Sequence, residues 1–529
     1  MIWAGLLVVW LLSGVAAQES GPGPSQAVPQ SPPRKVPIKR IVVSGVDGIA
    51  PELRREIHEL VKAYVGRQLS LADLQELTAE LNALFRERGF MLAQAVLPAQ
   101  AIAAGSVEIV VLQGKVGQVL VEGNETYSSD FLKARLGTAI AADGILMSEP
   151  FYRAVLLLNE LPDLEVKTVL KPGGVKGTTD VVLQVSDSLP VHGGLSYNNF
   201  GTPQTSTHRF GASFSAGNLL AESDLMTISG NFGTPFDRVG VFQGAYSFPV
   251  NLEGTRMGLL YSNSAFTVGQ ELEILDIRGR ANIFGLTLAH PTVRSLDRSD
   301  DLSLALFYKD ILNTFAGGIP FGKDVYGSMR LGYSMDLRDL RGRTIIQPAL
   351  TQGLGGNAAN DPLSSRLGAT GTFTRLNLDV VRVQVLGTQT YGLLRFSGQL
   401  AADPLFVSEE LALGGPDSVR GFAQSEFLGD LGYQVTAELN YSPLEEDPET
   451  DWSERQLLQL AAFVDHGSAW RLNSLPGEIA SRTLTGAGVG LRLGIFENAQ
   501  LRLDLGFPIA GAGPLDPTVI PYAQVQTTF

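Results

Sequence analysis

The sequence predicts a transmembrane β-barrel of about 16 antiparallel strands, preceded by two small α+β modules of the order βααββ. From residue 189 to residue 529, hydrophobic and polar residues alternate with a period of two in about 16 segments, an even number that is typical of bacterial outer-membrane barrels. Residues 38–188 carry the same order of strands and helices twice. After residue 17, no apolar run reaches the roughly 18 residues that a membrane helix needs. A chain that stays in a membrane must therefore do so as a barrel.

The first 37 residues have the composition of targeting and linker segments. Residues 1–17, MIWAGLLVVWLLSGVAA, are apolar and end in small residues, which predicts a cleavable export signal; a membrane anchor is the alternative. Residues 18–37 are rich in Pro, Gly, Ser and Gln and predict an extended tether. The absence of cysteine excludes a disulfide framework, and the net charge of −14 has the wrong sign for a nucleic-acid binder.

Residues 38–114 and 115–188 each read as one βααββ module. In the first, Pro51 opens a helix, and Ser70 with Asp73 forms a capping box for the next helix. In the second, SEPFYRAVLLLNEL is a helix that we expect Ser148 to cap, and LEVKTVL and TDVVLQVSD are strands. An internal duplication of this kind usually marks a serial binding arm; two spacer domains are the alternative.

The segment 189–529 alternates as barrel strands do. In GYQVTAELNY and AQLRLDLGF every second residue is apolar, and the other face carries polar residues such as Glu438, Arg502 and Asp504. Gly486, Gly488 and Gly490 recur every second residue in LTGAGVGLRLGIF. We interpret them as lumen-facing positions against which something packs closely, and not as a phosphate-binding loop.

One arginine stands out among glycines in LGGPDSVRGF, residues 413–422. By strand count, this stretch lies in the connection between strands eleven and twelve, about residues 401–431, which we name loop 6 and expect to fold back into the barrel. A guanidinium carried into a barrel needs a carboxylate partner. The alternation in LLQLAAFVDHG places Phe463 and Asp465 in the lumen, so we predict that Arg420 pairs with Asp465 and pins loop 6 across the pore.

These residues carry a close resemblance to a known family. The chain resembles the outer-membrane translocators of two-partner secretion, the TpsB transporters of haemolysins and filamentous haemagglutinin, which use the type V route. The two modules resemble polypeptide-transport-associated (POTRA) domains, as FRERGF, AVLPAQ and VEIVVLQGKVG indicate for the first one. Three further matches are the VRGF motif at the tip of loop 6, the FxDxG motif on strand thirteen and the aromatic C-terminus read during barrel insertion: Val419, Arg420, Gly421 and Phe422; Phe463, Asp465 and Gly467; Phe529.

The resemblance implies a function. An unfolded exoprotein would be captured by the POTRA modules in the periplasm, threaded through the outer-membrane barrel without nucleotide hydrolysis and folded outside. The capture edge is expected on the second module, at Val181, Val182 and Leu183 with Phe151 and Tyr152 beside them. The expected partners are a large β-helical exoprotein, outer-membrane lipid and lipopolysaccharide, and the barrel-assembly machinery during biogenesis, with no nucleic acid.

Three other functions remain open at this point. Insertion of other barrels into the membrane is the nearest, although assembly-type relatives usually carry three to five modules. A passive porin would explain the barrel and leave the two modules unexplained. An enzyme would need a catalytic constellation; the sequence has no GxSxG motif, and its five histidines are too dispersed to suggest a metal site or any other cofactor.

Overall fold

The computed structural model describes residues 35–102, 104–359, 361–444, 458–496, 498–513 and 517–529. The predicted export signal, residues 1–17, and residues 18–34 of the predicted tether lie outside these ranges. The chain forms two compact units that divide between Ser188 and Leu189, and each is described by itself. In the described part of the chain, no helix is both long and apolar enough to span a membrane.

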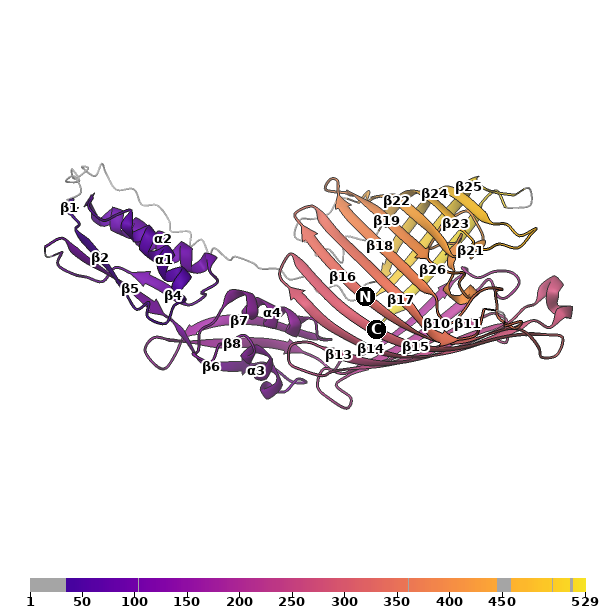
Figure 1. The fold of residues 1–529 in the computed structure, drawn as a ribbon, viewed down its shortest axis with the longest axis horizontal. Helices are drawn as coiled ribbons and strands as arrows, with labels where there is room; N and C mark the ends of the chain where they lie inside the picture. The colour runs from indigo at the N-terminus through magenta and orange to yellow at the C-terminus, as the bar shows by residue number, and fades with distance from the viewer. Residues whose placement is uncertain (1–34, 103, 360, 445–457, 497, 514–516) are drawn as a thin grey trace. The chain divides into compact units, whose positions relative to one another are not determined.

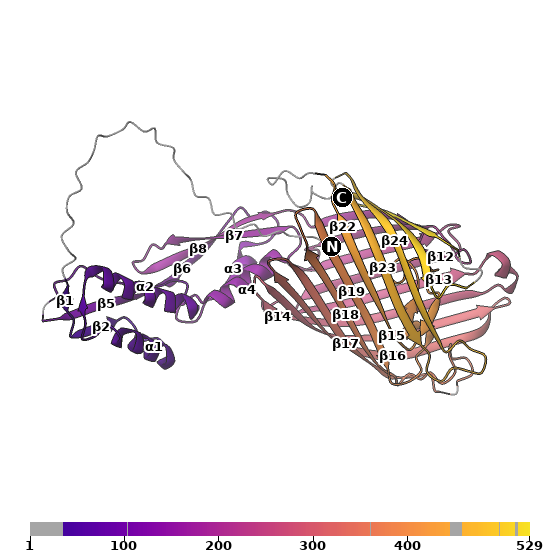
Figure 2. The same ribbon diagram turned by 90° about the horizontal axis from the view of Figure 1, so that it is seen from above.

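The first module is a three-stranded sheet covered by two helices (Figures 1 and 2). Its elements are β1 Val36–Pro37, β2 Arg40–Ser44, α1 Pro51–Lys62, β3 Gln68–Leu69, α2 Leu71–Glu87, β4 Ala93–Val96 and β5 Ser106–Gln113. The sheet order is β2-β5-β4, so β4 is an edge strand. Pro51 begins α1, and the capping box of Ser70 and Asp73 begins α2, as predicted.

The predicted start of this module at residue 38 is wrong by two residues. Val36 and Pro37 are not tether, because they pair with Leu69 and Gln68 as a small second sheet. The module therefore includes at least these two residues.

The second module repeats the order. Its elements are β6 Lys115–Glu122, α3 Ser129–Gly137, α4 Ser148–Asn159, β7 Leu164–Pro172 and β8 Thr178–Asp187. Ser148 does not cap α4 as we expected; Met147 holds the cap position without a side-chain bond. The Ser148 N–H, which has no partner within the helix, donates to the carbonyl of Gly89 in the first module.

The predicted capture edge on this module is also wrong. The sheet order is β6-β8-β7, so Val181, Val182 and Leu183 lie on the central strand and are 0% exposed. Phe151 is buried as well, and only Tyr152, at 44%, is exposed. Because β8 already bonds a strand on each side, it cannot accept another; the free edges of this sheet are β6 and β7.

The second unit is a closed antiparallel barrel of 16 strands, which confirms the predicted fold class. The barrel closes where β26 pairs with β9 and the backbone of Phe529 exchanges two hydrogen bonds with Gly193. The strands, in barrel order, are β9 Val191–Asn198, β10 Arg209–Gly217, β11 Leu225–Gly233, β12 Val239–Pro249, β13 Arg256–Thr267, β14 Arg278–Arg294, β15 Arg298–Phe315, β16 Ile319–Asp339, β17 Gly342–Gly356, β18 Thr374–Val385, β19 Thr390–Ala401, β22 Leu431–Tyr441, β23 Leu458–Trp470, β24 Ser481–Phe496, β25 Ala499–Ala510 and β26 Ile520–Thr528.

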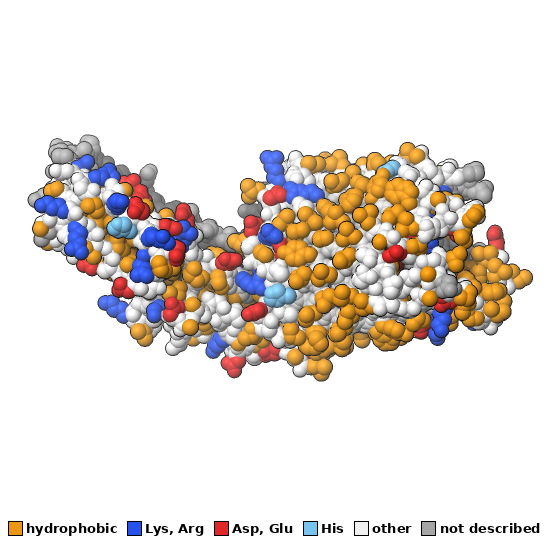
Figure 3. All heavy atoms as spheres, in the orientation of Figure 1, with side chains coloured by type: hydrophobic (Ala, Val, Ile, Leu, Met, Phe, Trp, Pro, Cys, Tyr) orange, Lys and Arg blue, Asp and Glu red, His pale blue; other side chains and the backbone are white. Residues whose placement is uncertain are grey.

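Alternation decides which residues face outward. On β23, Leu460 and Val464 are exposed, whereas Phe463 and Asp465 between and beside them are buried. Hydrophobic side chains cover the middle of the barrel face in Figure 3, and charged side chains gather toward its two ends. An apolar outer band of this kind matches the hydrocarbon layer of a membrane.

Candidate functional site in the barrel lumen

Loop 6 joins β19 to β22 and folds into the barrel. It contains a short 3₁₀ helix, η2 Val407–Glu409, and two short paired strands, β20 Leu411–Leu413 and β21 Phe427–Gly429. Apolar residues of the loop pack with two residues of the barrel wall: Leu413, Val419, Phe422 and Phe427 with Ala469 and Leu484. Gly421 has a φ of 99°, which a residue with a side chain rarely adopts, so glycine permits the turn at the tip.

The guanidinium of Arg420 lies against Asp465 in a two-pronged ion pair. Its Nε donates to Oδ2 at 2.7 Å and its Nη2 donates to Oδ1 at 3.0 Å, while the Arg420 backbone N–H donates to Oδ2 at 3.1 Å. Arg420 is 3% exposed and Asp465 is 0% exposed. This planar pairing is the one that arginine makes and lysine cannot.

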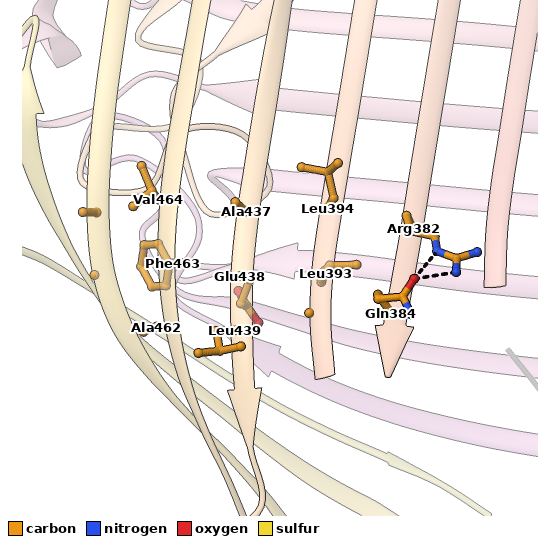
Figure 4. Close-up of a pocket in the computed structure, with 13 residues that line it drawn as sticks. Arg382, Gln384, Leu393, Leu394, Ala437, Glu438, Leu439, Ala462, Phe463 and Val464 are labelled. Atoms are coloured by element: carbon orange, nitrogen blue, oxygen red, sulfur yellow. Dashed lines mark hydrogen bonds between the residues drawn. The ribbon is translucent and has the colours of Figure 1, made fainter. Parts of the chain in front are cut away.

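A second carboxylate and an aromatic ring complete the surroundings of Arg420. Nη1 donates to Glu438 Oε2 at 2.8 Å, and the guanidinium carbon lies 3.2 Å from the centre of the Phe463 ring. Glu438 on β22 and Phe463 on β23 are direct cross-strand neighbours (Figure 4). Burial alone would lower the pKa of Arg420, but Asp465 and Glu438 raise it, so the side chain stays charged.

The charges around the loop tip balance. Asp504 lies 3.6 Å from Arg420 and binds Arg492 at 2.6 Å and Arg502 at 2.8 Å, and Arg492 reaches Glu438 at 3.4 Å. We call these six residues the lumen cluster: Arg420, Glu438, Asp465, Arg492, Arg502 and Asp504. Three cations face three carboxylates, so the buried groups compensate one another.

Glycines on the facing strands make room for the loop tip. A side chain at Gly486 or Gly506 would collide with the backbone of Arg420, and one at Gly488 would collide with the Phe463 ring. The Gly421 N–H donates to the Tyr522 hydroxyl at 3.1 Å, and this hydroxyl donates to the Phe422 carbonyl at 2.8 Å. Something does pack closely at all three predicted glycines: loop 6 at Gly486, the Leu505 carbonyl and the Phe463 ring at Gly488, and the Asp504 and Arg492 side chains at Gly490.

The base of loop 6 carries a second ionic anchor that sequence reasoning missed. Glu409, 2% exposed, binds Lys309, the Arg375 guanidinium at 2.7 Å and the Tyr326 hydroxyl at 2.7 Å. Arg366 binds Glu410 at 2.6 Å and also Asp430. The available signal was the Glu-Glu pair in VSEELALGG, two acidic residues in an apolar, glycine-rich stretch.

Replacing Glu409 with glutamine is expected to loosen the base of loop 6. Burial alone would raise the pKa of Glu409, but Lys309 and Arg375 hold it below its ordinary value. The contribution of Glu409 is therefore present above the ordinary glutamate pKa and lost as the pH falls through the lowered one. The neutral variant leaves two cations unbalanced, which costs about 2 kcal/mol in a site that water partly reaches.

Limited proteolysis of the full-length protein measures this loosening as faster cleavage within loop 6. Glu271, on the exposed 3₁₀ helix η1 Gln270–Leu275, provides the matched control. Equal cleavage rates in the wild type, Glu409→Gln and Glu271→Gln would show that the base anchor contributes nothing.

The other singled-out residues lie as follows. Gly467 lies next to Val419 of loop 6: a Cβ added at Gly467 would be 3.3 Å from Val419 Cγ2. His466 points away from Asp465 and contacts Tyr433 and Thr485. Within the described residues, no group of three or more His, Cys, Asp and Glu side chains is arranged to hold a metal ion.

A closed 16-stranded barrel with an inward-folded loop, preceded by two α+β modules, defines the architecture of an outer-membrane barrel protein with POTRA-like modules. The model of the haemolysin secretion/activation protein family ShlB/FhaC/HecB matches residues 177–493, and the model of the ShlB-type POTRA domain matches residues 36–114. The chain belongs to this haemolysin secretion/activation family. The protein is an outer-membrane transporter of two-partner secretion exoproteins, with periplasmic POTRA domains, and not an enzyme.

Individual relatives agree with this assignment. The outer membrane transporter CdiB of Dickeya dadantii is 23% identical over 495 residues, which cover 90% of this chain and 84% of that protein. The hemolysin transporter protein ShlB of Serratia marcescens is 25% identical over 435 residues, 79% of this chain and 74% of that protein. The solved structure of CdiB from Escherichia coli has a TM-score of 0.74 at 21% identity and covers 96% of this chain and 93% of its own.

The fold is also shared with a second solved structure. BamA from Haemophilus ducreyi, in a crystal structure lacking POTRA domains 1–3, has a TM-score of 0.53 at 13% identity and covers 94% of this chain and 100% of its own. A likeness at this identity concerns the fold alone.

Proposed function

We propose that the POTRA modules capture an extended segment of an unfolded exoprotein in the periplasm and that the barrel threads it to the cell surface, where folding prevents its return. The observation that carries this proposal is the way in which loop 6 is bound inside the barrel. The loop tip is held by ion pairs and hydrogen bonds as well as by a small apolar cluster, and the polar contacts exchange for water at small net cost. A polar passage also keeps the backbone groups of an extended chain solvated.

In this proposal Arg420 and Asp465 are positioning residues. They hold Val419, Gly421 and Phe422 at one place on the barrel wall, and Phe463 and Gly467 shape that place. Direction comes from folding outside the cell, without nucleotide hydrolysis. The cargo is expected to be large and β-helical, since an extended chain that folds progressively into a β-helix would draw itself outward.

Two further partners belong to the proposal. The apolar outer face contacts lipid and lipopolysaccharide; Leu394, Leu439 and Val464 lie on this face, each exposed by about half (Figure 4). The barrel-assembly machinery inserts the protein and reads Phe529. The pairing of Phe529 with Gly193 at the barrel seam supports this role, because the last residue then takes part in closure.

A second candidate function is insertion of other barrels into the membrane. Against it, assembly-type relatives usually carry three to five modules, whereas the described part of this chain has two. A passive porin is the third, and it leaves both modules without a role.

Deleting residues 36–188 separates these functions. We expect the barrel to reach the outer membrane and a co-expressed candidate β-helical exoprotein to remain in the periplasm, because nothing then captures it. Quantifying the exoprotein in the culture medium makes the measurement, with the surface exposure of the barrel as its control. If no exoprotein depends on the protein while other barrels fail to assemble in its absence, the protein is an insertase.

A further inference from the structure

Each POTRA module contains an asparagine that bonds the backbone of an edge strand. Asn82 on α2 accepts from the Ala95 N–H at 2.7 Å and donates to the Ala95 carbonyl at 3.1 Å. Asn159 on α4 accepts from the Val166 N–H at 2.8 Å and donates to the Val166 carbonyl at 3.1 Å. The two asparagines occupy the same place in the repeat, Leu-Asn-x-Leu at residues 81–84 and 158–161.

A side-chain amide offers one donor group and one acceptor, as a peptide unit does. An asparagine that bonds both backbone groups of one residue therefore occupies the position that an added strand would use. Ala95 lies on β4 and Val166 on β7, and both strands are sheet edges. At these two residues, the edge is closed to an incoming strand.

The remaining open edge of β7 is short. Residues of an antiparallel strand alternate between bonding the neighbouring strand and pointing away from it. Because the backbone groups of Val166 point toward Asn159, those of Thr168 and Leu170 point outward too, and among the described residues they have no partner outside the sheet. Pro172 ends the row because it has no N–H. Two consecutive outward-facing residues therefore remain on the C-terminal side of Val166, whereas Leu164 on the other side is separated from them by Asn159.

The corresponding edge of β4 is closed at both ends. The same alternation makes Met91, Ala93 and Ala95 face outward. The side chain of Asn82 bonds both backbone groups of Ala95, and the Met91 N–H donates to the Leu146 carbonyl of the second module at 3.3 Å. Only the outward-facing backbone groups of Ala93 remain available on β4. Hydrogen bonds to a single residue do not fix the register of an added strand.

We propose that Asn82 and Asn159 are edge terminators, which make the two modules unequal. An extended segment of the unfolded exoprotein pairs with Thr168 and Leu170 of the second module, and the first module accepts none at β4. The inference rests on the proposed function and deepens it, because it locates the captured segment and fixes its register.

Proline substitution tests where the segment binds, since proline removes one N–H and is tolerated where that N–H faces outward on an edge strand. In the full-length protein, we expect Thr168→Pro to lower secretion of the co-expressed exoprotein about ten-fold. Thr168→Ala, which keeps the backbone N–H, and Ala93→Pro, on the closed edge of the first module, are expected to leave secretion within about two-fold of the wild type.

Amide hydrogen exchange of the full-length protein tests the terminators without any exoprotein. The Val166 amide is expected to exchange slowly and those of Thr168 and Leu170 rapidly. Asn159→Leu should make Val166 rapid and leave Ala95 slow, and Asn82→Leu should do the reverse. Slow exchange of the β8 amides in Thr168→Pro verifies that the module stays folded.

The outcomes separate this inference from the proposed function. If deletion of residues 36–188 stops secretion while Thr168→Pro and Ala93→Pro have equal effects, the inference is wrong and the capture function stands. If Asn159→Leu leaves Val166 protected, the terminator role is wrong. If the deletion leaves secretion intact, the capture function fails, and the inference with it.

Discussion

Replacing Arg420 with alanine is expected to stop secretion of the exoprotein while the barrel still reaches the outer membrane. The variant removes the cation that Asp465 and Glu438 share, and both carboxylates remain buried in the wall. Breaking a buried ion pair from one side costs about 3–5 kcal/mol, because the partner charge is left uncompensated. The remaining contacts between loop 6 and the barrel wall are then too weak to hold Val419 and Phe422 in place.

Two quantities measure this effect: the amount of exoprotein in the medium and the protection of loop 6 from a protease. Arg420→Lys is expected to recover only part of both, since an ammonium cannot make the two-pronged contact. Arg278→Ala is the matched control, because that arginine pairs with Asp276 at an exposed site, with a side-chain exposure of 64%. Normal secretion by Arg420→Ala would show that the clamp has no part in transport.

Replacing Gly486 with valine is expected to displace loop 6 while leaving every charge of the lumen cluster in place. A Cβ at Gly486 would collide with the carbonyl group of Arg420, which is backbone and cannot rotate away. Forcing extra volume into such a contact costs about 1–3 kcal/mol, so the fraction of molecules with loop 6 in its bound position should fall about five-fold or more. Secretion and protease protection of the loop should fall together.

Gly240→Val provides the control for this substitution. Gly240 is also a strand residue of the barrel, but the nearest neighbour of a Cβ added there is the Phe232 ring at 3.9 Å, which is an ordinary contact. We expect this variant to secrete as the wild type does. If Gly486→Val also secretes normally, the position of the loop tip is not what transport requires.

The barrel and the Arg420–Asp465 contact could be anticipated because strand alternation carries most of the necessary information. A period of two assigns each residue to lipid or lumen, and a charged residue on the lumen side needs a partner there. This argument placed Asp465, Glu438 and Asp504 on the inner face. It could not show that Glu438 and Asp504 also surround Arg420, because strand alternation does not predict the path of the loop across the lumen.

The capture edge could not be placed correctly because the order of strands along the chain does not give their order in the sheet. In the second module the last strand, β8, inserts between β6 and β7. The sequence did contain a signal, since Val181, Val182 and Leu183 are three consecutive apolar residues, which is typical of a strand buried on both faces.

Other errors came from contacts between residues distant in the chain. Ser148, which we expected to cap α4, instead bonds the carbonyl of Gly89, which belongs to the other module. The anchor at Glu409 depends on Lys309, which lies 100 residues earlier in the chain. Neither partner can be identified from local pattern or propensity.

A double-mutant cycle at Arg420 and Asp465 tests the central claim, that this pair acts as one clamp for an exporting barrel. Secreted exoprotein is measured for the wild type, Arg420→Ala, Asp465→Ala and the double variant, at equal amounts of barrel in the outer membrane. If the pair is one clamp, the double variant secretes no less than either single variant, because the second substitution removes a charge that the first had left unpaired. Losses that multiply, as for two independent sites, would contradict it.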